Sequence, residues 1–335
     1  MTGGPFSGVA PKAGVWLAAL AAALLVAPWA INAYLLSVLT LILYLAYVGQ
    51  AWNVMMGFAG QLSLGHALYV GLGGYVAAAF FVHFGIPPAI GMFAAVTVAV
   101  VFGAGIGFLA FRFGVGGVYF ALLTIAFAEF TRIGFDRFGW VGGSGGFFLK
   151  VAQREHNDLI NLRGSPIMFY YVILVLTALA FFLCHRLLRS KIGYYWLAIR
   201  EDQEAAQAAG INVFRYKMLA VMLSAGMAAL AGVFTAFFNN NLFPFQIFSI
   251  DKSIEIILGP IIGGLGTLFG PILGAFVLTL MAEVLHEAMD AASISLPGVK
   301  QVFYGICLLV VVLFLPNGIW PTLKRKLGLG RRGDA

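Results

Sequence analysis

Ten apolar runs, separated by short polar or glycine-rich segments, make up most of the chain. They cover residues 15–31, 34–56, 66–84, 90–111, 115–133, 167–187, 218–238, 254–265, 267–284 and 302–320. Most are long enough, at ~1.5 Å per helical residue, to cross a hydrocarbon core of ~30 Å. The pattern therefore predicts an all-α, polytopic membrane protein with about ten transmembrane helices in a single domain over residues 1–335. The run 254–265 is too short for a full crossing, so 254–284 is expected to form a tight hairpin or a broken helix.

The composition supports a membrane location rather than soluble domains. The chain is 61% hydrophobic and 10% charged, whereas soluble domains carry roughly 25% charged residues. The net charge of +7 comes from basic residues scattered at the ends of the apolar runs, which is typical of membrane orientation and not of nucleic-acid binding. The two cysteines, Cys184 and Cys307, lie in different runs, so neither a disulfide framework nor a metal site is expected.

The distribution of basic residues predicts the orientation. With a cytoplasmic N-terminus and ten alternating crossings, thirteen of the twenty Lys and Arg residues fall on the inner side, as the positive-inside rule requires. This arrangement places the segment 189–217 and the C-terminus in the cytoplasm, and the longest outer loop at 134–166. A nine-span alternative that merges 254–284 into one helix would move only the C-terminus, and the basic residues of that tail favour ten spans.

The segment 189–217 carries charges of both signs between two apolar runs. Within it, the alanine-rich stretch 197–209 has high helix propensity, and Gly210 is suited to a helix C-terminus. Glu201, Asp202 and Glu204 lie toward the first half of this helix, where acidic residues interact favourably with the helix dipole. The stretch is therefore expected to form a short cytoplasmic helix that docks on a partner, and the alternative is a solvated loop with nothing bound.

Polar and glycine residues interrupt the apolar pattern around residues 53–66. Irregular backbone at membrane depth is tolerated only where it packs inside protein or lines a watery cavity. The candidate pathway or gating residues in this segment are Asn53, Gln61, Ser63 and His66. The alternative is a cytoplasmic turn between two spans, in which His66 caps a helix or is a satisfied core histidine.

Glu129 is an ionisable residue inside an apolar run, and such residues are functional candidates by default. Arg132 follows it at the i, i+3 spacing that lets the two side chains pair on a helix. A structural ion pair is the favoured interpretation, and gating is the second.

The late glycine-rich stretch predicts close packing of two helices. Small residues spaced about four apart allow helix backbones to approach each other, and proline kinks or ends a helix. The residues expected to serve this packing, with the interface between permease subunits as its place, are Gly263, Gly264, Gly266, Gly270, Pro271 and Gly274. The alternative is that they contact the substrate.

These segments together resemble the branched-chain amino acid permeases of the LivM type. Asn53 to Ala67 (NVMMGFAGQLSLGHA) is similar to their early signature, Gly142 to Gly146 (GGSGG) to an outer-loop element, and Gly263 to Ala275 to their late hairpin. The remaining motif resembles the EAA loop of ABC importer permeases, whose short helix docks on the ATP-binding subunit. It follows the sixth span, as in vitamin-B12-type importers, and its matching residues are Arg200, Glu201, Glu204, Ala205, Ala206 and Gly210.

The resemblance implies the permease fold of the vitamin-B12-importer-like class in a multi-pass protein of the bacterial inner membrane. The implied function is import of branched-chain or hydrophobic amino acids by ATP-driven alternating access. The implied partners are a second permease of the LivH type, two ATP-binding subunits and an extracytoplasmic amino-acid-binding protein. Urea or short-amide permeases share much of this pattern and are the alternative within the class.

The chain has no GxxxxGK[ST] phosphate loop, so ATP is expected to be bound by partner subunits, and no cofactor is expected in this chain. It also has no nucleophile elbow, HExxH motif or Cys/His metal set, so an intramembrane enzyme is not indicated. An ion-coupled secondary transporter is the alternative from a different class. It would need carboxylates near the midplane of the membrane, for which Glu129 is the main buried candidate, and it gives the segment 189–217 no role.

Overall fold

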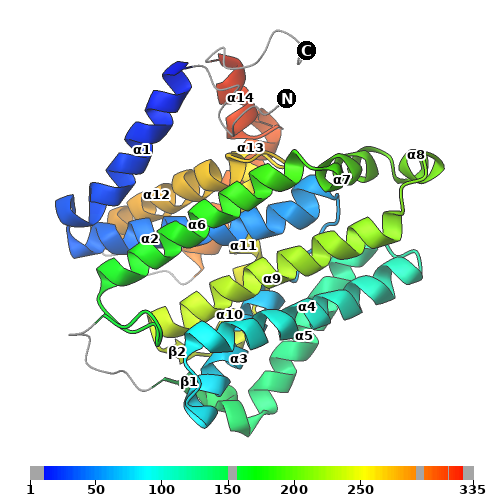
Figure 1. Cartoon of the computed structure of the whole chain (residues 1–335). Helices are drawn as coiled ribbons and strands as arrows, with labels where there is room; N and C mark the ends of the chain where they lie inside the picture. The colour runs from blue at the N-terminus through cyan, green and yellow to red at the C-terminus, as the bar shows by residue number, and fades with distance from the viewer. Residues whose placement is uncertain (1–10, 150–156, 292–297, 316, 327–335) are drawn as a thin grey trace.

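The structure, a computed structural model, describes residues 11–149, 157–291, 298–315 and 317–326, most of which are helical (Figure 1). The first half of the chain forms α1 (Pro11–Ala30), α2 (Ala33–Asn53), the π-helix η1 (Val54–Phe58), α3 (Ala67–Phe84), α4 (Pro88–Arg112), α5 (Val118–Arg137), η2 (Gly139–Val141) and η3 (Gly143–Gly145). The second half forms α6 (Pro166–Leu188), α7 (Lys191–Glu201), α8 (Gln203–Ala208), α9 (Val213–Asn239), α10 (Pro244–Ile247), α11 (Ile250–Gly263), α12 (Gly270–Ala291), α13 (Val299–Phe314) and α14 (Ile319–Lys326).

A helix lies on each of the ten apolar runs. Within the described residues, six helical stretches are long and apolar enough to cross a membrane: 33–58, 67–84, 88–112, 118–137, 166–188 and 213–239. α11 has only 14 residues, which at ~1.5 Å per residue is shorter than a hydrocarbon core. The predicted run 302–320 is not one helix, because α13 ends at Phe314 and α14 begins at Ile319.

Hydrogen-bonding side chains define where many of the helices start. A polar side chain at the N-cap accepts a backbone N–H of the first turn, which otherwise lacks a partner. Asn32, Ser165, Ser190, Asp202, Asn212 and Ser249 cap α2, α6, α7, α8, α9 and α11 in this way.

Close packing of α9 against α3 and α4 forms the centre of the bundle (Figure 1). Small residues make this approach possible. A Cβ atom at Gly73 would lie 2.1 Å from the carbonyl oxygen of Ala229, and one at Gly232 would lie 1.9 Å from that of Val70. Such contacts are shorter than any van der Waals separation, so the crossing of α3 and α9 requires glycine at both positions.

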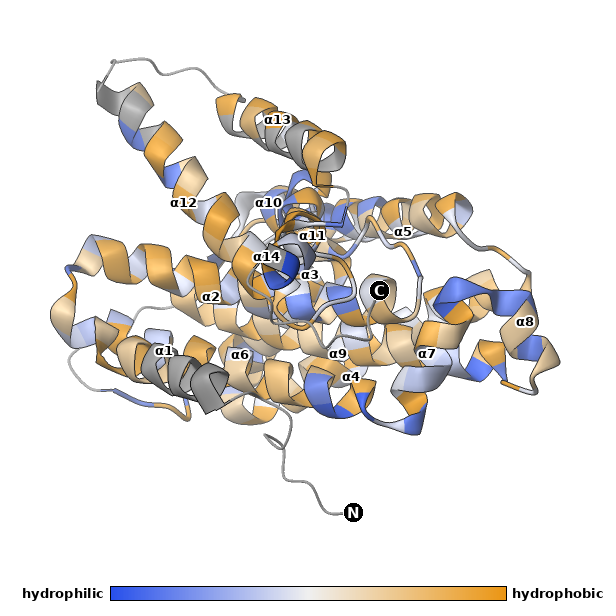
Figure 2. Cartoon of the chain, turned by 90° about the horizontal axis from the view of Figure 1, so that it is seen from above, coloured by the Kyte–Doolittle hydropathy of each residue, from blue (hydrophilic) through white to orange (hydrophobic). Residues whose placement is uncertain are grey.

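The connections between helices gather at two ends of the bundle. At one end, η1, the loop after α4, α7, α8, the turn between α11 and α12, and α14 contact one another. At the other end, the backbone of Ala89 bonds to Ile160, and Leu149 bonds to Asn240. Figure 2 shows apolar residues dominating the long helices, with hydrophilic residues prominent in α8 and α14.

A small antiparallel ladder departs from the all-α prediction. β1 (Phe147–Phe148) pairs with β2 (Asn241–Leu242), and Phe147 lies opposite Leu242. The ladder ties the predicted outer loop 134–166, of which residues 150–156 lie outside the described part, to the loop after α9. It fixes the second end of the bundle without changing its helical class.

Candidate functional site

The early glycine-rich motif ends the α2 helix in a π-helix followed by a tight turn. Gly60 has φ +70°, a left-handed conformation that glycine adopts without strain. The backbone N–H of Gln61 donates to the carbonyl of Met55, and the indole Nε1 of Trp52 donates to the carbonyl of Ser63 at 2.8 Å. The motif is therefore a hydrogen-bonded, largely buried turn at one end of the bundle, and π-helical turns are frequent at functional sites.

Asn53 joins this turn to the late glycine-rich hairpin. Its side-chain oxygen accepts the backbone N–H of Gly266 at 2.9 Å, and its Nδ2 donates to the carbonyl of Thr267 at 2.9 Å. One turn earlier on α2, Gln50 Nε2 donates to the carbonyl of Leu268 at 2.6 Å. The side-chain amides of Asn53 and Gln50 thus supply hydrogen-bond partners to three backbone groups of the 264–269 turn. Buried backbone groups need such partners.

Arg200 connects the predicted coupling segment to the same place. Its Nη1 donates to the carbonyl oxygen of Gly57 at 2.6 Å, and its Nη2 pairs with Glu201 at 2.8 Å. A Cβ atom at Gly60 would lie 3.2 Å from the Arg200 Cα, and one at Gly266 would lie 2.4 Å from Nη1. The early turn, the late hairpin and α7 therefore meet at one junction, here called the Arg200 junction and defined by Asn53, Gly57, Gly60, Arg200 and Gly266.

The coupling segment is two helices rather than the single helix predicted over 197–209. Asp202 has φ −153° and ψ 110°, which is extended backbone and ends α7. Its side chain accepts the N–H groups of Glu204 and Ala205 at 2.9 and 3.0 Å and so starts α8. Asp is among the strongest N-cap residues, and capping here outweighs the helix propensity of the alanines around it.

The end of α8 matches the prediction for Gly210. Gly210 has φ +85°, its N–H donates to Gln207, and the N–H of Ile211 donates to Ala206. This pair of bonds is the Schellman motif that commonly ends a helix. Ala206 is buried in a small apolar cluster with Ile199 and Val213, while the predicted coupling residues Glu201, Glu204 and Ala205 are exposed.

Gln61, Ser63 and His66 are buried beside the junction. Gln61 Nε2 donates to the carbonyl of Ala59 at 2.8 Å. Ser63 Oγ and both ring nitrogens of His66 have no hydrogen-bond partner among the described residues. The His66 side chain is 0% exposed and packs edge-on against Tyr69, with ring centroids 5.4 Å apart. His66 precedes α3 without a side-chain capping bond, so neither the helix cap nor the hydrogen-bonded core histidine considered above is present.

Glu129 forms the predicted ion pair with Arg132, with Oε1 and Nη2 2.5 Å apart. The expectation that Glu129 is a buried carboxylate is wrong, because 52% of its side chain is exposed in this chain. It lies on the face of α5 that turns away from the bundle. An ion-coupled transporter would therefore lack the buried carboxylate for which Glu129 was the main candidate.

The late glycines pack α11 against α12 within the chain itself. A Cβ atom at Gly263 would lie 1.7 Å from the Gly270 carbonyl oxygen, and one at Gly274 would lie 1.7 Å from that of Gly259. Gly264 and Gly266 have positive φ and form the turn, and Pro271 stands in the first turn of α12. These residues make a tight helical hairpin, which is the intrachain form of the predicted packing.

Sequence reasoning missed Gln50, Thr267 and Lys217. Gln50 is a fully buried amide in a long apolar run, which is a signal that a polar partner must lie opposite. Lys217 precedes the predicted run 218–238 and counts there only among the basic residues of the inner side, but it is 7% exposed. It is the fifth residue of α9, and its burial beside Phe111 depends on tertiary packing.

Comparison with known proteins places these motifs in one family. The family described as "Branched-chain amino acid transport system / permease component" matches residues 34–312. The high-affinity branched-chain amino acid transport system permease protein LivM of Escherichia coli is 26% identical over 95% of this chain and 77% of its own length. LivH of the same organism is 29% identical over 48% of this chain and 49% of its length. The fructose import permease protein FrcC of Rhizobium meliloti is 31% identical over 35% of the chain and 34% of its length. No solved structure matches.

Proposed function

The chain belongs to the branched-chain amino acid transport permease family and is a multi-pass membrane permease subunit of an ABC importer. From that premise, we propose that it moves branched-chain amino acids across the membrane. We propose further that the Arg200 junction couples a partner ATPase to the spans. The single observation that carries this coupling is the contact of Arg200, in the EAA-like segment, with Gly57 in the glycine motif. The relatives favour neither a urea or short-amide permease nor an ion-coupled transporter.

The contacts between loops support ten crossings in the vitamin-B12-importer-like arrangement. With ten alternating spans, one side receives the segments near residues 57, 114, 200, 266 and 320. These are the segments that contact one another at the first end of the bundle. The loops expected on the opposite side, such as 85–87, 138–149 and 240–243, meet at the other end. The helices too short for a full crossing by themselves, such as α11, would then cross as broken or tilted pairs.

The coupling proposal assigns α8 to the ATP-binding partner. Glu204 and Ala205 are exposed on a two-turn helix, whose contacts with its own chain include buried Ala206 and the hydrogen bond that Gln203 accepts from Lys217. α7 anchors that helix, because Trp196 is fully buried and its Nε1 donates to the carbonyl of Tyr216 at 2.8 Å. A push on α8 is thus passed to α7, through Arg200 to Gly57, and through Asn53 to the late hairpin. We place this end in the cytoplasm of a bacterial inner membrane, with both termini on that side.

The face of α5 that points away from the bundle is proposed to contact a second permease of the LivH type. It exposes Tyr119, Leu122 and Phe130 around the Glu129–Arg132 pair. An ion pair along a spanning helix is costly against lipid tails and acceptable against protein or water. The substrate pathway would then lie between the two permeases and be largely apolar, which suits leucine, isoleucine or valine.

The remaining partners are proposed from the resemblance to ABC importer permeases, and the absence of a phosphate loop in the sequence agrees with an ATP site on another subunit. Two ATP-binding subunits would supply the ATP site, this chain would need no cofactor, and an extracytoplasmic amino-acid-binding protein would deliver the substrate to the 134–166 end. Specificity would reside chiefly in that binding protein.

Affinity purification of the tagged chain from its native membrane, followed by mass spectrometry, tests the assembly. Recovery of a second permease and two ATP-binding subunits, together with ATP-dependent leucine uptake by the reconstituted complex, is the expected result. A chain that purifies alone or as a homo-oligomer without an ATPase would contradict the proposal.

A further inference from the structure

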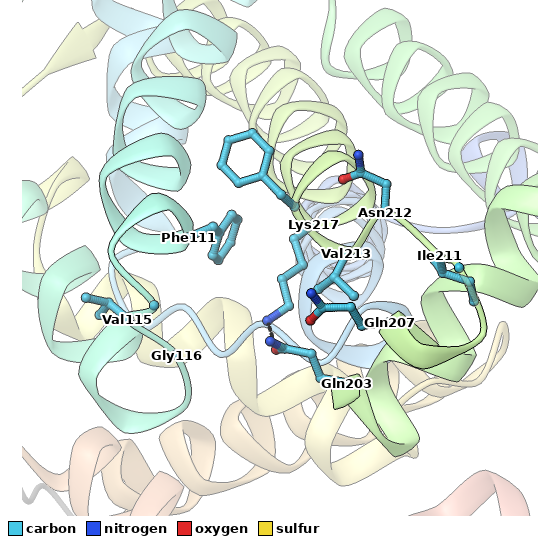
Figure 3. Close-up of a pocket in the computed structure, with 12 residues that line it drawn as sticks. Phe111, Val115, Gly116, Gln203, Gln207, Ile211, Asn212, Val213 and Lys217 are labelled. Carbon is cyan, nitrogen blue, oxygen red and sulfur yellow. Dashed lines mark hydrogen bonds between the residues drawn. The ribbon is translucent and has the colours of Figure 1, made fainter. Parts of the chain in front are cut away.

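A cavity of about 550 Å³ lies at the same end of the bundle as α8 but apart from the Arg200 junction (Figure 3). Its walls come from the end of α4, the loop 114–116, α8 and the first turn of α9. The volume falls within the range of small-molecule sites, ~300–1,000 Å³. A single side-chain carboxylate from a docked protein would fill only part of it.

The cavity contains one buried cation, Lys217. The residue is only 7% exposed, and its Nζ donates to the side-chain oxygen of Gln203. The Phe111 ring centroid lies 5.4 Å from Nζ. Figure 3 shows the lysine reaching between the Phe111 ring and the two glutamines of α8, Gln203 and Gln207.

These contacts leave the charge of Lys217 without a counter-ion. No ion pair found in the described part of the chain includes it. A buried ammonium is costly unless an opposite charge compensates it, and a carboxamide oxygen and a ring face compensate it only in part. Two of its three N–H donors remain for a further acceptor, which must enter from the cavity.

The surroundings favour an anionic group beside Lys217. The N-cap Asn212 and the first residues of α9, Val213 and Phe214, line the cavity. The N-terminus of a helix carries a partial positive charge. The Asn212 side chain accepts the N–H of Arg215, whereas the N–H groups of Val213 and Phe214 precede the first intrahelical bond. The carboxamide of Gln207 adds neutral donors. The acidic residues of the coupling segment, Glu201 and Glu204, do not line it.

We infer that the Lys217 cavity binds a small ligand or lipid headgroup that carries a carboxylate or phosphate group. Lys217 and the first turn of α9 hold the oxyanion, the amides of Gln203 and Gln207 fix its orientation, and Phe111 and Val115 form the apolar wall. The ligand would sit against α8 and could thereby alter how that helix meets a partner. That this end faces the cytoplasm rests on the orientation proposed above, while the binding itself does not.

The test is ligand-dependent stabilisation of the purified permease assembly at constant ionic strength. Inorganic phosphate and acetate are the soluble probes, and nanodiscs with and without phosphatidylglycerol are the lipid probe. A ligand that binds only the native state stabilises it by RT ln(1 + L/Kd), where L is the free ligand concentration, so the melting temperature rises with ligand concentration. Stabilisation by phosphate or acetate identifies a soluble oxyanion, and stabilisation by phosphatidylglycerol alone identifies a headgroup.

Three variants make the result specific. Lys217→Met keeps the apolar stem and removes the charge, so the affinity for the responding probe should fall about tenfold or more, as for loss of a charged hydrogen bond. Lys191→Met, an exposed lysine of the same segment, should leave it unchanged. Gly116→Leu should fold, because a Cβ atom there meets nothing within 4 Å. Since Gly116 lines the cavity, the leucine side chain should obstruct binding without altering charge, which provides a test if Lys217→Met does not fold.

Absence of stabilisation by every probe, or equal stabilisation of the wild type and both cavity variants, would overturn the inference. So would phosphate binding by the permeases alone that disappears when the ATP-binding subunits are added, because an acidic side chain of the partner would then be the occupant. Recovery of the ATP-binding subunits is scored separately, so failure of this inference is distinguishable from failure of the coupling proposal.

Discussion

Arg200 donates a hydrogen bond from Nη1 to the carbonyl oxygen of Gly57 at 2.6 Å, across 143 positions of sequence. The bond joins the segment expected to meet an ATPase to the glycine-rich turn that ends α2. The planar guanidinium also pairs with Glu201 through its second terminal nitrogen, a two-point arrangement that a lysine cannot reproduce. This contact links α7 directly to the end of α2.

Asn53→Leu should destabilise the chain by about 2–4 kcal/mol. It leaves the N–H of Gly266 and the carbonyl of Thr267 without their side-chain partners, and each unsatisfied buried group costs ~1–3 kcal/mol. Thermal unfolding of the purified chain in detergent measures the change. Ser37→Ala on the exposed part of the same helix is the control, and equal melting temperatures for the two variants would contradict the role of Asn53.

Gly274→Ala should disrupt the α11–α12 hairpin, because its Cβ atom would stand 1.7 Å from the Gly259 carbonyl oxygen. Separating the two helices to make room should cost a few kcal/mol, as overpacking does. Gly105→Ala in α4 meets nothing within 4 Å and should be neutral or slightly stabilising. Limited proteolysis and melting temperature compare the pair, and a fully stable Gly274→Ala chain would refute the packing account.

Glu204→Lys should leave the fold of the chain intact and weaken its association with the ATP-binding subunits. The side chain is exposed, so reversing its charge changes the docking surface more than the chain itself. Gly210→Pro should have the same effect on association by a different route, because proline cannot adopt φ +85° or supply the N–H that reaches Gln207. Co-purified ATPase per permease is the readout, and normal recovery and normal uptake in both variants would defeat the coupling assignment.

Glu129→Leu should reduce recovery of the second permease while changing the stability of the isolated chain little. The pair with Arg132 is half exposed in this chain, and exposed helix pairs contribute only ~0.3–0.5 kcal/mol. Against a partner or a wet pathway, the unpaired Arg132 would cost more. The yield of the permease pair after affinity purification tests this, with Thr97→Leu, on the exposed side of α4, as the control. An unchanged yield would place the α5 face against lipid.

A helix lies on each of the ten apolar runs, because long continuous apolar stretches are what a helix needs to cross a membrane. The turn within 254–284 was also predicted, but the runs did not reveal the other points at which helices end. Asp202 divides the predicted helix 197–209 by capping, a local competition that propensity does not resolve. The 302–320 run divides before Gly318, which has φ +82°.

The sequence motifs indicated which residues matter but not how they meet. Asn53 and Gly266 are 213 positions apart, and nothing local in either segment encodes their hydrogen bond. The same holds for Lys217, whose burial depends on a loop far away in the sequence. The exposure of Glu129 was also beyond prediction, because an apolar run gives no indication of which face turns toward a neighbour.

Coupling through Arg200 can be measured as ATP hydrolysis and leucine uptake on the same proteoliposomes, with the assembled importer carrying Arg200→Met. Loss of a charged hydrogen bond of ~1.5–3 kcal/mol corresponds to about tenfold or more in an equilibrium. We expect the ATP-binding subunits to remain bound and to hydrolyse ATP, while leucine taken up per ATP falls about tenfold or more. An unchanged ratio of uptake to hydrolysis in Arg200→Met would contradict this coupling.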